Sequence, residues 1–390
     1  MLINFLLLCV ISLMYFIFVL LTKEYRRSSF IFSLSIPIIF FTPSIYYFFG
    51  GVSYRFFDDS SLSVFMLYGA VSMFLYMIIK TLFLTCKINS NIEKINQSLC
   101  TKIYSVLIVL PVILYYLYYA KQMPLMTFIL SGELIERPDV TGSIPFFYTV
   151  STLVWIVIPS IYFLNFDEVK NRTHHFIINA AIVFMLISSG NKGSVVYYFL
   201  FCWFYILNFK IGLKVGLMFI FLLFVYLITK GIGEFNTETL SYVLESPFRR
   251  FFVTQGACFI TRFDMVSDGY GVEFSNVRGI KFDVFQKMYN TTDIVGSCPT
   301  FFTGELMVEF GVIASIVLFC CVSLLVCSLS SFSIKDQSTR LCIYWSVFSV
   351  LFLISMAEIN INSILRFLVA LINFFALFYL SKLSVKAKGS

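Results

Sequence analysis

The chain has 390 residues, of which 59% are hydrophobic and 13% are charged, and its mean hydropathy is +0.90. A soluble protein of this length cannot bury so much apolar surface, so the composition excludes a soluble globular class. The net charge of +7 is typical of basic loops beside membrane spans, and no basic repeat or binding motif indicates a nucleic-acid partner. Continuous apolar runs predict an all-α polytopic membrane protein, because the strands of a membrane barrel would alternate.

About 11 (10–12) apolar segments are long enough to be predicted as transmembrane helices. In chain order they cover residues 2–22, 28–49, 62–85, 103–120, 146–165, 175–189, 194–209, 215–229, 304–328, 341–357 and 365–381. The first segment lacks the charged start of a cleaved signal peptide, and Lys23, Arg26 and Arg27 follow it directly. We therefore expect a retained first helix whose N-terminus lies outside the cytoplasm.

The distribution of lysine and arginine sets the predicted orientation. Connectors assigned to the cytoplasm hold 15 of the 28 basic residues, whereas the short connectors on the other side hold five. Basic residues are enriched in short cytoplasmic loops, while long loops translocate largely regardless of charge. The chain is therefore divided into residues 1–229, with eight helices and an outer loop at 121–145; a large outer loop at 230–303; and residues 304–390, with three helices and a cytoplasmic tail. Lys80, near the inner end of its span, is expected to reach toward the interface.

Two short apolar segments, 175–189 and 194–209, are joined by a glycine-containing turn at 189–194. They can be two tilted spans or one re-entrant hairpin. In both cases Lys192 lies at a tight turn near the outer face.

The large outer loop carries four arginines, Arg249, Arg250, Arg262 and Arg278. Together with Lys192 they can form an anion clamp, because the arginine fork makes bidentate, charge-assisted bonds to phosphate. The alternative is a solvated surface of ion pairs, since the loop holds eight acidic and seven basic residues.

Residues 241–264 of this loop combine apolar and basic side chains after Pro247, which can open a helix. This pattern predicts a helix that lies in the outer interface. Cys258 and Cys298 are both in the same loop, so a disulfide between them is possible if the loop lies outside the cytoplasm.

Glu305 directly follows Gly304 at the mouth of a span, and Glu309 lies one turn further along. A carboxylate in a partly apolar mouth is a candidate general base. The alternative is an N-terminal helix charge that the helix dipole favours. Glu358, at the outer end of the tenth predicted span, can line the same cavity or mark the membrane interface.

The outer loop at 121–145 contains Glu133, Glu136, Arg137 and Asp139, which can bind sugar hydroxyls or phosphate, or form a self-satisfied turn. The two histidines of the chain, His174 and His175, fall in a predicted cytoplasmic connector. The sequence therefore predicts neither a metal site nor histidine-based catalysis.

Four features together resemble the Wzy-type oligosaccharide repeat-unit polymerases, the O-antigen polymerases of Gram-negative bacteria. PTFFTGELMVEFG at 299–311 resembles the family's P-x-F-x-G-E-L…F-G run, and ISSGNKG at 187–193 resembles its G-x-R-G turn, with Lys192 in place of arginine. Arg249 and Arg250 before an aromatic run, followed by Phe263 and Asp264, resemble the start of its periplasmic loop. The large loop also precedes the last three spans, as in the family.

The resemblance implies a GT-C-like architecture in the bacterial inner membrane, with an active site that faces the periplasm. It implies a glycosyltransferase without metal or cofactor that moves a growing glycan from undecaprenyl diphosphate onto a lipid-linked repeat unit. Membrane lipid and a Wzz-type chain-length regulator are the implied partners. The expected site residues are Glu305, Arg250 and Lys192 for catalysis; Lys192, Arg249, Arg250, Arg262 and Arg278 for the diphosphate; and Arg137, Glu136 and Asp264 for sugar.

Two other classes of protein fit part of the pattern. A transporter or a flippase of lipid-linked glycans would place charge near the midplane and tend to show internal repeats, whereas this chain concentrates charge at the outer rim. An O-antigen ligase-like transferase would be favoured by an outer histidine, and an acyltransferase by a His–Asp or serine dyad. Neither feature is visible in the sequence.

Overall fold

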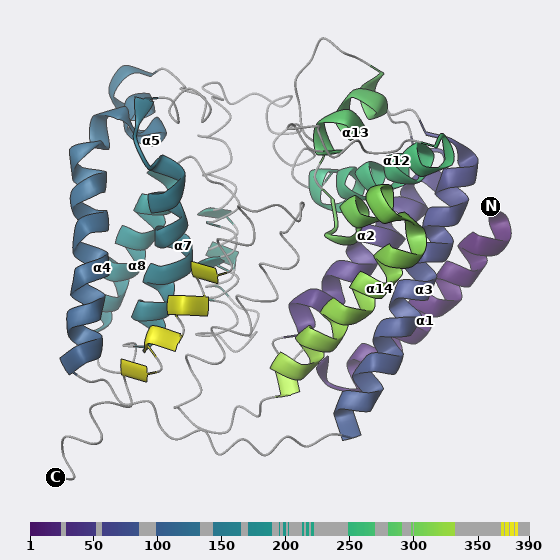
Figure 1. The fold of residues 1–390 in the computed structure, drawn as a ribbon, viewed down its shortest axis with the longest axis horizontal. Coiled ribbons are helices and arrows are strands. Elements are labelled where there is room, and N and C mark those ends of the chain that lie inside the picture. Colours follow the sequence, from purple (N-terminus) through teal and green to yellow (C-terminus); the bar gives the residue numbers. More distant parts are fainter. Residues whose placement is uncertain are drawn as a thin grey trace. The chain divides into compact units, whose positions relative to one another are not determined.

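The computed structural model describes residues 1–24, 29–51, 57–85, 99–132, 143–164, 171–188, 249–269, 280–290, 298 and 300–331, together with isolated positions between 195 and 221 and between 368 and 380. Every regular element in this part of the chain is a helix, which confirms the all-helical class (Figure 1). Four of these helices are long and apolar enough to cross a membrane: α1 (Leu2–Leu21), α3 (Asp59–Thr85), α4 (Leu99–Tyr118) and α14 (Thr303–Ser331).

Three shorter apolar helices coincide with further predicted spans: α2 (Phe30–Phe48), α7 (Phe147–Leu164) and α8 (Arg172–Ser188). Only isolated helical positions are described within 194–209, 215–229 and 365–381, and 341–357 lies outside the described residues. The count of about 11 spans and the GT-C-like architecture therefore stay predictions.

The chain folds as two compact units. Unit 1 comprises residues 1–90, 244–333 and 349–364, and it contains α1, α2, α3, a π-helix η4 (Arg250–Thr254), α12 (Gln255–Ser267), α13 (Ile280–Tyr289) and α14. Unit 2 comprises the remaining residues and contains α4, a short 3-10 helix η2 (Ala120–Gln122), α5 (Pro124–Ser131), α7 and α8.

The core of unit 1 is aromatic. Phe40 of α2 packs edge-on against Phe259 of α12 and Phe301, with ring centroids 5.3 and 5.7 Å apart, and Tyr68 of α3 lies 5.3 Å from Phe259. These rings come from segments more than 190 residues apart in sequence, so the predicted large loop at 230–303 contributes to the same hydrophobic core as the first three helices.

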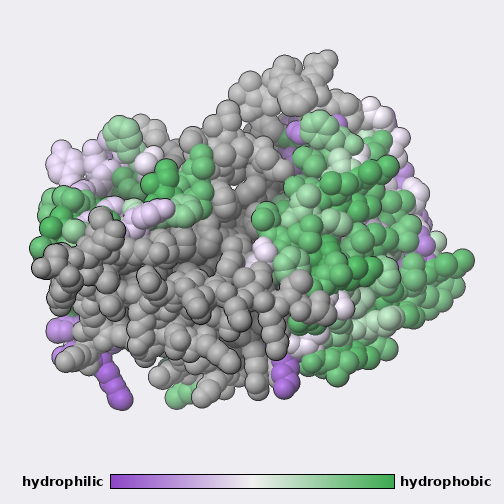
Figure 2. Space-filling model, turned by 60° about the horizontal axis from the view of Figure 1, so that its bottom comes forward, coloured by the Kyte–Doolittle hydropathy of each residue, from purple (hydrophilic) through white to green (hydrophobic). Residues whose placement is uncertain are grey.

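The outward faces of the unit 1 helices are also hydrophobic, as Figure 2 shows over this part of the surface. On α1 the exposed stripe consists of Leu2, Ile3, Leu6, Val10, Leu13, Ile17 and Leu20, of which Ile3 is 81% exposed. A continuous apolar face of this length would be unfavourable in water and is stabilised by lipid. The protein is therefore membrane-associated.

Unit 1 has two distinct ends. The starts of α1 and α3 lie together, since Asn4 Nδ2 donates to Ser63 Oγ at 2.9 Å. Thr42, near the end of α2, donates from Oγ1 to the Phe252 carbonyl at 2.8 Å and so brings α12 to the same end. We call this the α12 end. Lys80 lies more than 20 residues along α3 and marks the other end, about 30 Å away at 1.5 Å per residue.

Helix α14 is two helices joined at Gly311, whose φ of 85° and ψ of 172° are not helical. Ser315 Oγ donates to the Thr303 carbonyl at 3.0 Å, whereas twelve residues of straight helix would separate these positions by roughly 18 Å. Residues 303–310 therefore fold back across the start of 312–331. The predicted span 304–328 is interrupted, and 312–331 is the piece with the length of a membrane span.

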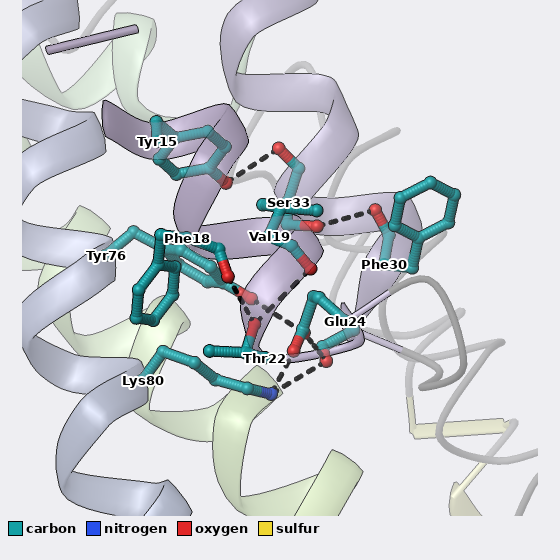
Figure 3. A network of polar contacts seen from close by, with 10 residues as sticks. Tyr15, Phe18, Val19, Thr22, Glu24, Phe30, Ser33, Tyr76 and Lys80 are labelled. Atoms are coloured by element: carbon teal, nitrogen blue, oxygen red, sulfur yellow. Dashed lines mark hydrogen bonds and ion pairs between the residues drawn. The ribbon is translucent and has the colours of Figure 1, made fainter. Parts of the chain in front are cut away.

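At the Lys80 end, a buried network joins α1, α2 and α3 (Figure 3). Lys80 Nζ lies 2.9 Å from Glu24 Oε1 and donates to Ser29 Oγ at 2.9 Å. The hydroxyls of Ser29 and Tyr76 both donate to Glu24 Oε1, and the Glu24 and Lys80 side chains are 0% exposed. The expectation that Lys80 extends to the interface is therefore wrong, because Glu24 at the end of α1 gives the ammonium a buried partner.

Unit 2 contains a polar chain between α7 and α8. Tyr162 OH lies 2.9 Å from His175 Nδ1, Asn179 Nδ2 donates to Tyr162 OH at 2.7 Å, and Tyr198 OH donates to Asn179 Oδ1 at 2.5 Å. His174 and His175 were predicted in a connector, but α8 begins at Arg172, so both lie in its first turn. The hydroxyl of Tyr162 gives Nδ1 of His175 a hydrogen-bond partner within unit 2.

We predict that replacing one partner of the Glu24–Lys80 pair destabilises unit 1 more than replacing both. The single substitutions Glu24→Gln and Lys80→Met should each lower the free energy of unfolding by about 3–5 kcal/mol, because each leaves a polar group buried without its partner. The double substitution should restore most of this loss. Lys121→Met, at an exposed position, serves as the control.

The measurement is denaturant unfolding of the purified protein in mixed micelles. Additive losses in the double variant would contradict the buried ion pair.

Candidate functional site

Residues 249–264 of the predicted interfacial helix at 241–264 are helical, but most of them are buried instead of lying on a surface, and 241–248 lie outside the described residues. A continuous helix runs from Arg249 through η4 and α12 to Ser267, and ten consecutive residues from Gly256 to Met265 are buried. A helix that is buried on all sides belongs to the core. The large outer loop therefore places a helix inside the α12 end of unit 1.

Glycine permits the closest contact of this helix. A Cβ atom at Gly256 would lie 2.2 Å from Pro43 Cγ and 3.0 Å from the Ile39 carbonyl oxygen. A larger residue at this position cannot be accommodated without moving α2 or α12. Gly256 thus allows α12 to cross α2 at the point where Thr42 binds the Phe252 carbonyl.

Arg262 is the central charge of the α12 end, and it is 0% exposed. Its Nη2 lies 2.6 Å from Glu305 Oε1 and donates to the Cys298 carbonyl at 3.1 Å, while Nη1 donates to the Cys258 carbonyl at 2.8 Å. Three acceptors from both sides of a long connection therefore surround one guanidinium, which is how a charge becomes tolerable inside a protein.

This arrangement explains the Gly-Glu pair of the 299–311 stretch. A Cβ atom at Gly304 would lie 2.6 Å from Thr300 Cγ2 and 3.0 Å from Arg262 Cδ. Gly304 therefore leaves room for the arginine side chain, and Glu305 supplies its counter-charge. Thr300 Oγ1 donates to the Gln255 carbonyl at 2.7 Å and fixes the segment against the start of α12.

Cys258 and Cys298 form the disulfide that the sequence left open, with Cα atoms 5.7 Å apart. It joins α12 to the segment that leads into α14, next to a small apolar cluster with Ile280, Val284 and Met288 of α13. A crosslink over 40 residues of separation removes conformational entropy from the unfolded chain, worth on the order of 4 kcal/mol.

Asp264 is a second buried charge on α12, at 4% exposed. The Asp58 backbone N–H donates to its two carboxylate oxygens at 3.2 and 3.3 Å. Burial raises the pKa of Asp264, and hydrogen bonds from the Ser61 side chain and the Asp58 backbone partly oppose this shift. The carboxylate therefore ties α12 to the start of α3.

The expected site residues fall into three groups. Arg262, Glu305 and Asp264 lie together at the α12 end, whereas Arg249 is exposed at the start of the same long helix. Thirteen helical residues separate Arg249 from Arg262 by about 20 Å, so the two do not share one small anion. Arg250 begins η4, and its side chain lies outside what the structure describes, as do Lys192, Arg278, Glu136 and Arg137 entirely.

Sequence reasoning missed the residues that hold these charges in place. Asp58, Thr42 and Gly256 carry no motif, and their partners lie about 200 residues away. The Asp58–Asp59 pair before an apolar run is a usual helix-start signal, but it does not reveal that the Asp58 N–H binds Asp264. Glu305 is buried, whereas Glu309, one turn further along the same helix, is exposed.

Among the described residues, no group of three or more histidine, cysteine, aspartate or glutamate side chains could hold a metal ion. Comparison of the chain with protein families, with curated proteins and with solved structures gives no match.

We predict that alanine substitution at three glycines destabilises the protein more where less space surrounds the glycine. Gly256→Ala should lower the free energy of unfolding by about 3 kcal/mol and Gly304→Ala by about 1–3 kcal/mol, because the added methyl group overpacks each contact. Gly216→Ala is the matched control, since a Cβ atom there meets nothing within 4 Å. It should leave stability unchanged or raise it slightly.

Thermal unfolding of the three variants in detergent checks the order. Equal effects at Gly304 and Gly216 would contradict the close passage of Arg262.

We predict that Asp264 makes the protein more stable in mild acid than at neutral pH, relative to Asp264→Asn. The folded state holds this proton more tightly than the unfolded chain does, because burial raises the pKa of the carboxyl above its ordinary value of 3.8. Stability therefore falls as the pH rises from that value through the raised pKa. Asparagine keeps an oxygen for the Asp58 N–H and removes the titration.

The difference in melting temperature between wild type and Asp264→Asn, measured from pH 4 to pH 7, isolates this group from other carboxyls. A difference that grows in favour of wild type with rising pH would contradict the sign.

Proposed function

We propose that the protein is an O-antigen or surface polysaccharide polymerase of the bacterial inner membrane. In this proposal it transfers a growing glycan from undecaprenyl diphosphate to a lipid-linked repeat unit at the periplasmic face. One observation carries the proposal: a helix has the exposed Arg249 at its start, while Arg262, Glu305 and the disulfide hold its other half in the core. Catalysis by electrostatic stabilisation needs charges fixed on such a rigid element.

The orientation in the proposal is supported by two independent features. The disulfide lies at the α12 end, together with the starts of α1 and α3. Structural disulfides persist in oxidising compartments such as the periplasm. At the opposite end, α1 is followed directly by Lys23, Arg26 and Arg27. A short basic segment of this kind is typical of a cytoplasmic loop.

The proposed reaction is a displacement at the anomeric carbon of the donor glycan. The acceptor hydroxyl oxygen forms the new glycosidic bond, the bond to the diphosphate oxygen breaks, and undecaprenyl diphosphate leaves with the electron pair. The hydroxyl proton passes to a base. Arg249, Arg250, Lys192 and Arg278 are proposed to stabilise the charge on the leaving diphosphate, because cations near a departing phosphate lower the barrier.

Arg262 and Glu305 take positioning roles in this proposal. Each side chain is buried and paired with the other, so neither is presented to a lipid-linked substrate. Glu305 is therefore no longer proposed as the general base, and no described residue is proposed in its place. Asp264 holds the Asp58 backbone, which leaves Glu136 and Arg137 as the proposed sugar-binding residues. A Wzz-type chain-length regulator is the proposed protein partner, and the reaction requires no metal or cofactor.

A transporter or flippase of lipid-linked glycans is the second candidate, favoured by the buried Glu24–Lys80 pair. Charges inside a membrane domain often mark a transport pathway. Here the pair is closed by Ser29 and Tyr76, which favours a structural role. The lipid-linked intermediate separates the two: loss of a polymerase gives surface glycan capped at a single repeat unit, whereas loss of a flippase traps the repeat unit on the cytoplasmic side.

We predict that Arg249→Ala, Arg250→Ala and Lys192→Ala each reduce chain extension by about 100-fold or more, since each removes a cation from the leaving group. Arg250→Lys should also be impaired if the contact is bidentate. Arg172→Ala, an exposed arginine at the start of α8, is the matched control and should retain full activity.

The measurement is polysaccharide length on a gel in a deletion strain that expresses each variant at equal membrane levels. A complete ladder of chains in all three variants would overturn the diphosphate site.

A further inference from the structure

The buried guanidinium of Arg262 is bonded to both halves of the disulfide. Nη1 donates to the carbonyl oxygen of Cys258 at 2.8 Å, and Nη2 donates to the carbonyl oxygen of Cys298 at 3.1 Å and to Glu305 at 2.6 Å. The disulfide and the bond from Nη2 to the Cys298 carbonyl therefore connect the same two segments, α12 and the segment before α14. The Cys258 carbonyl lies on α12 itself, four residues before Arg262, so the crosslink fixes one of the three acceptors, the Cys298 carbonyl.

The disulfide is inaccessible in the folded protein. Cys258 is 1% exposed and Cys298 is 2% exposed, and Met288, Val284 and Ala257 surround them at 0%. Thiol–disulfide exchange requires a thiolate to approach one sulfur in line with the bond. A reductant cannot do so here without local unfolding, so the crosslink does not have the exposure of a reversible redox switch.

We propose that Cys258 and Cys298 are an oxidative maturation site, closed by an extracytoplasmic protein disulfide before α12 packs. One cysteine thiolate attacks the partner's disulfide to give a mixed disulfide, and the second cysteine thiolate displaces the partner. The two cysteines lose two electrons and two protons, and the partner leaves as a dithiol. The partner class is a thiol oxidase with a reactive disulfide, which acts on the translocated 230–303 segment while both sulfurs are still accessible.

The order of events follows from the burial of charge. Without the crosslink, Cys298 and Glu305 must reach Arg262 through a connection of 36 to 43 residues from α12. Closing that connection costs conformational entropy, which the disulfide removes in advance. Maturation therefore precedes the packing of Arg262, and through it the placement of the helix that carries Arg249. This last step and the extracytoplasmic location of the loop rest on the proposed function, whereas the burial of the disulfide and the exchange chemistry do not.

The primary test counts accessible thiols in the purified full-length protein with a maleimide–polyethylene glycol gel shift. Wild type should gain two modified cysteines only when reductant is combined with denaturant, and none when reductant is added in native detergent. Cys258→Ser/Cys298→Ser should show no such gain. Cys100→Ser, which removes an exposed free cysteine, should lower the count by one in every condition and leave the melting temperature unchanged.

A second arm uses cells that lack the extracytoplasmic thiol oxidase. Protein from these cells should contain the two extra free thiols, melt about 10 °C lower than the oxidised protein, and lose chain extension at least about 10-fold. Supplying a small-molecule disulfide to the growing cells should restore all three properties. Protected thiols in the absence of the oxidase, or release of the thiols by reductant in native detergent, would overturn the maturation step.

A third arm tests the link to Arg262. Arg262→Met should lower the melting temperature at least twofold less in the Cys258→Ser/Cys298→Ser background than in wild type. The reason is that, without the disulfide, the Cys298 carbonyl and Glu305 are no longer held beside the guanidinium, so less is lost when it is removed. Additive losses would refute the coupling. The thiol count and the melting temperature do not depend on activity. Inactive wild type with protected thiols would therefore refute the polymerase alone, and active protein with free thiols would refute the maturation alone.

Discussion

The fold of unit 1 depends on the burial of one charge, the guanidinium of Arg262. An ion taken out of water destabilises a protein by several kcal/mol unless it is paired and hydrogen-bonded. Here Glu305 and the carbonyls of Cys258 and Cys298 accept hydrogen bonds from its two Nη atoms, and these acceptors come from α12, from the segment before α14 and from the first turn of α14. The arginine can be satisfied only when both segments are in place, so its burial makes their packing cooperative. The close passage at Gly304 and the disulfide serve the same junction.

The Lys80 end of unit 1 also contains a buried ion pair, with a lysine in place of the arginine. Glu24 and Lys80 form a buried pair about 30 Å along α3 from the α12 end, and an aromatic core that includes Phe40 and Phe259 fills the space between. At each end, a carboxylate beside one helix binds a cation on another. Aromatic packing alone would tolerate small shifts of the helices along one another, whereas two directional ion pairs fix the helices in a single register.

Much of this architecture was predictable from the sequence, because apolar runs specify transmembrane helices locally. The predicted first span, 2–22, matches α1 (Leu2–Leu21), and the spans at 28–49 and 62–85 match α2 and α3 within a few residues. The Arg262–Glu305 pair was not predictable, since nothing in a single sequence links residues 43 positions apart. The break at Gly311 was also missed, because an apolar run on both sides of a glycine has the pattern of one continuous span. The disulfide was an open possibility, since only topology put both cysteines on the oxidising side.

The sequence offered two readings of the arginines, a ligand clamp or a set of ion pairs, and the structure shows why the charge count could not decide. Arg262 forms an ion pair with Glu305, and Lys287 forms one with Asp268 at an exposed site. These two basic residues of the loop therefore stabilise the fold. Arg249 lies about 20 Å along the helix and is exposed. The ion-pair interpretation therefore holds for Arg262 and Lys287, whereas the ligand-clamp interpretation stays a proposal for Arg249. A helix whose buried half is held by Arg262 can present an arginine from its exposed half, because a cation stabilises a departing phosphate only if its support does not move.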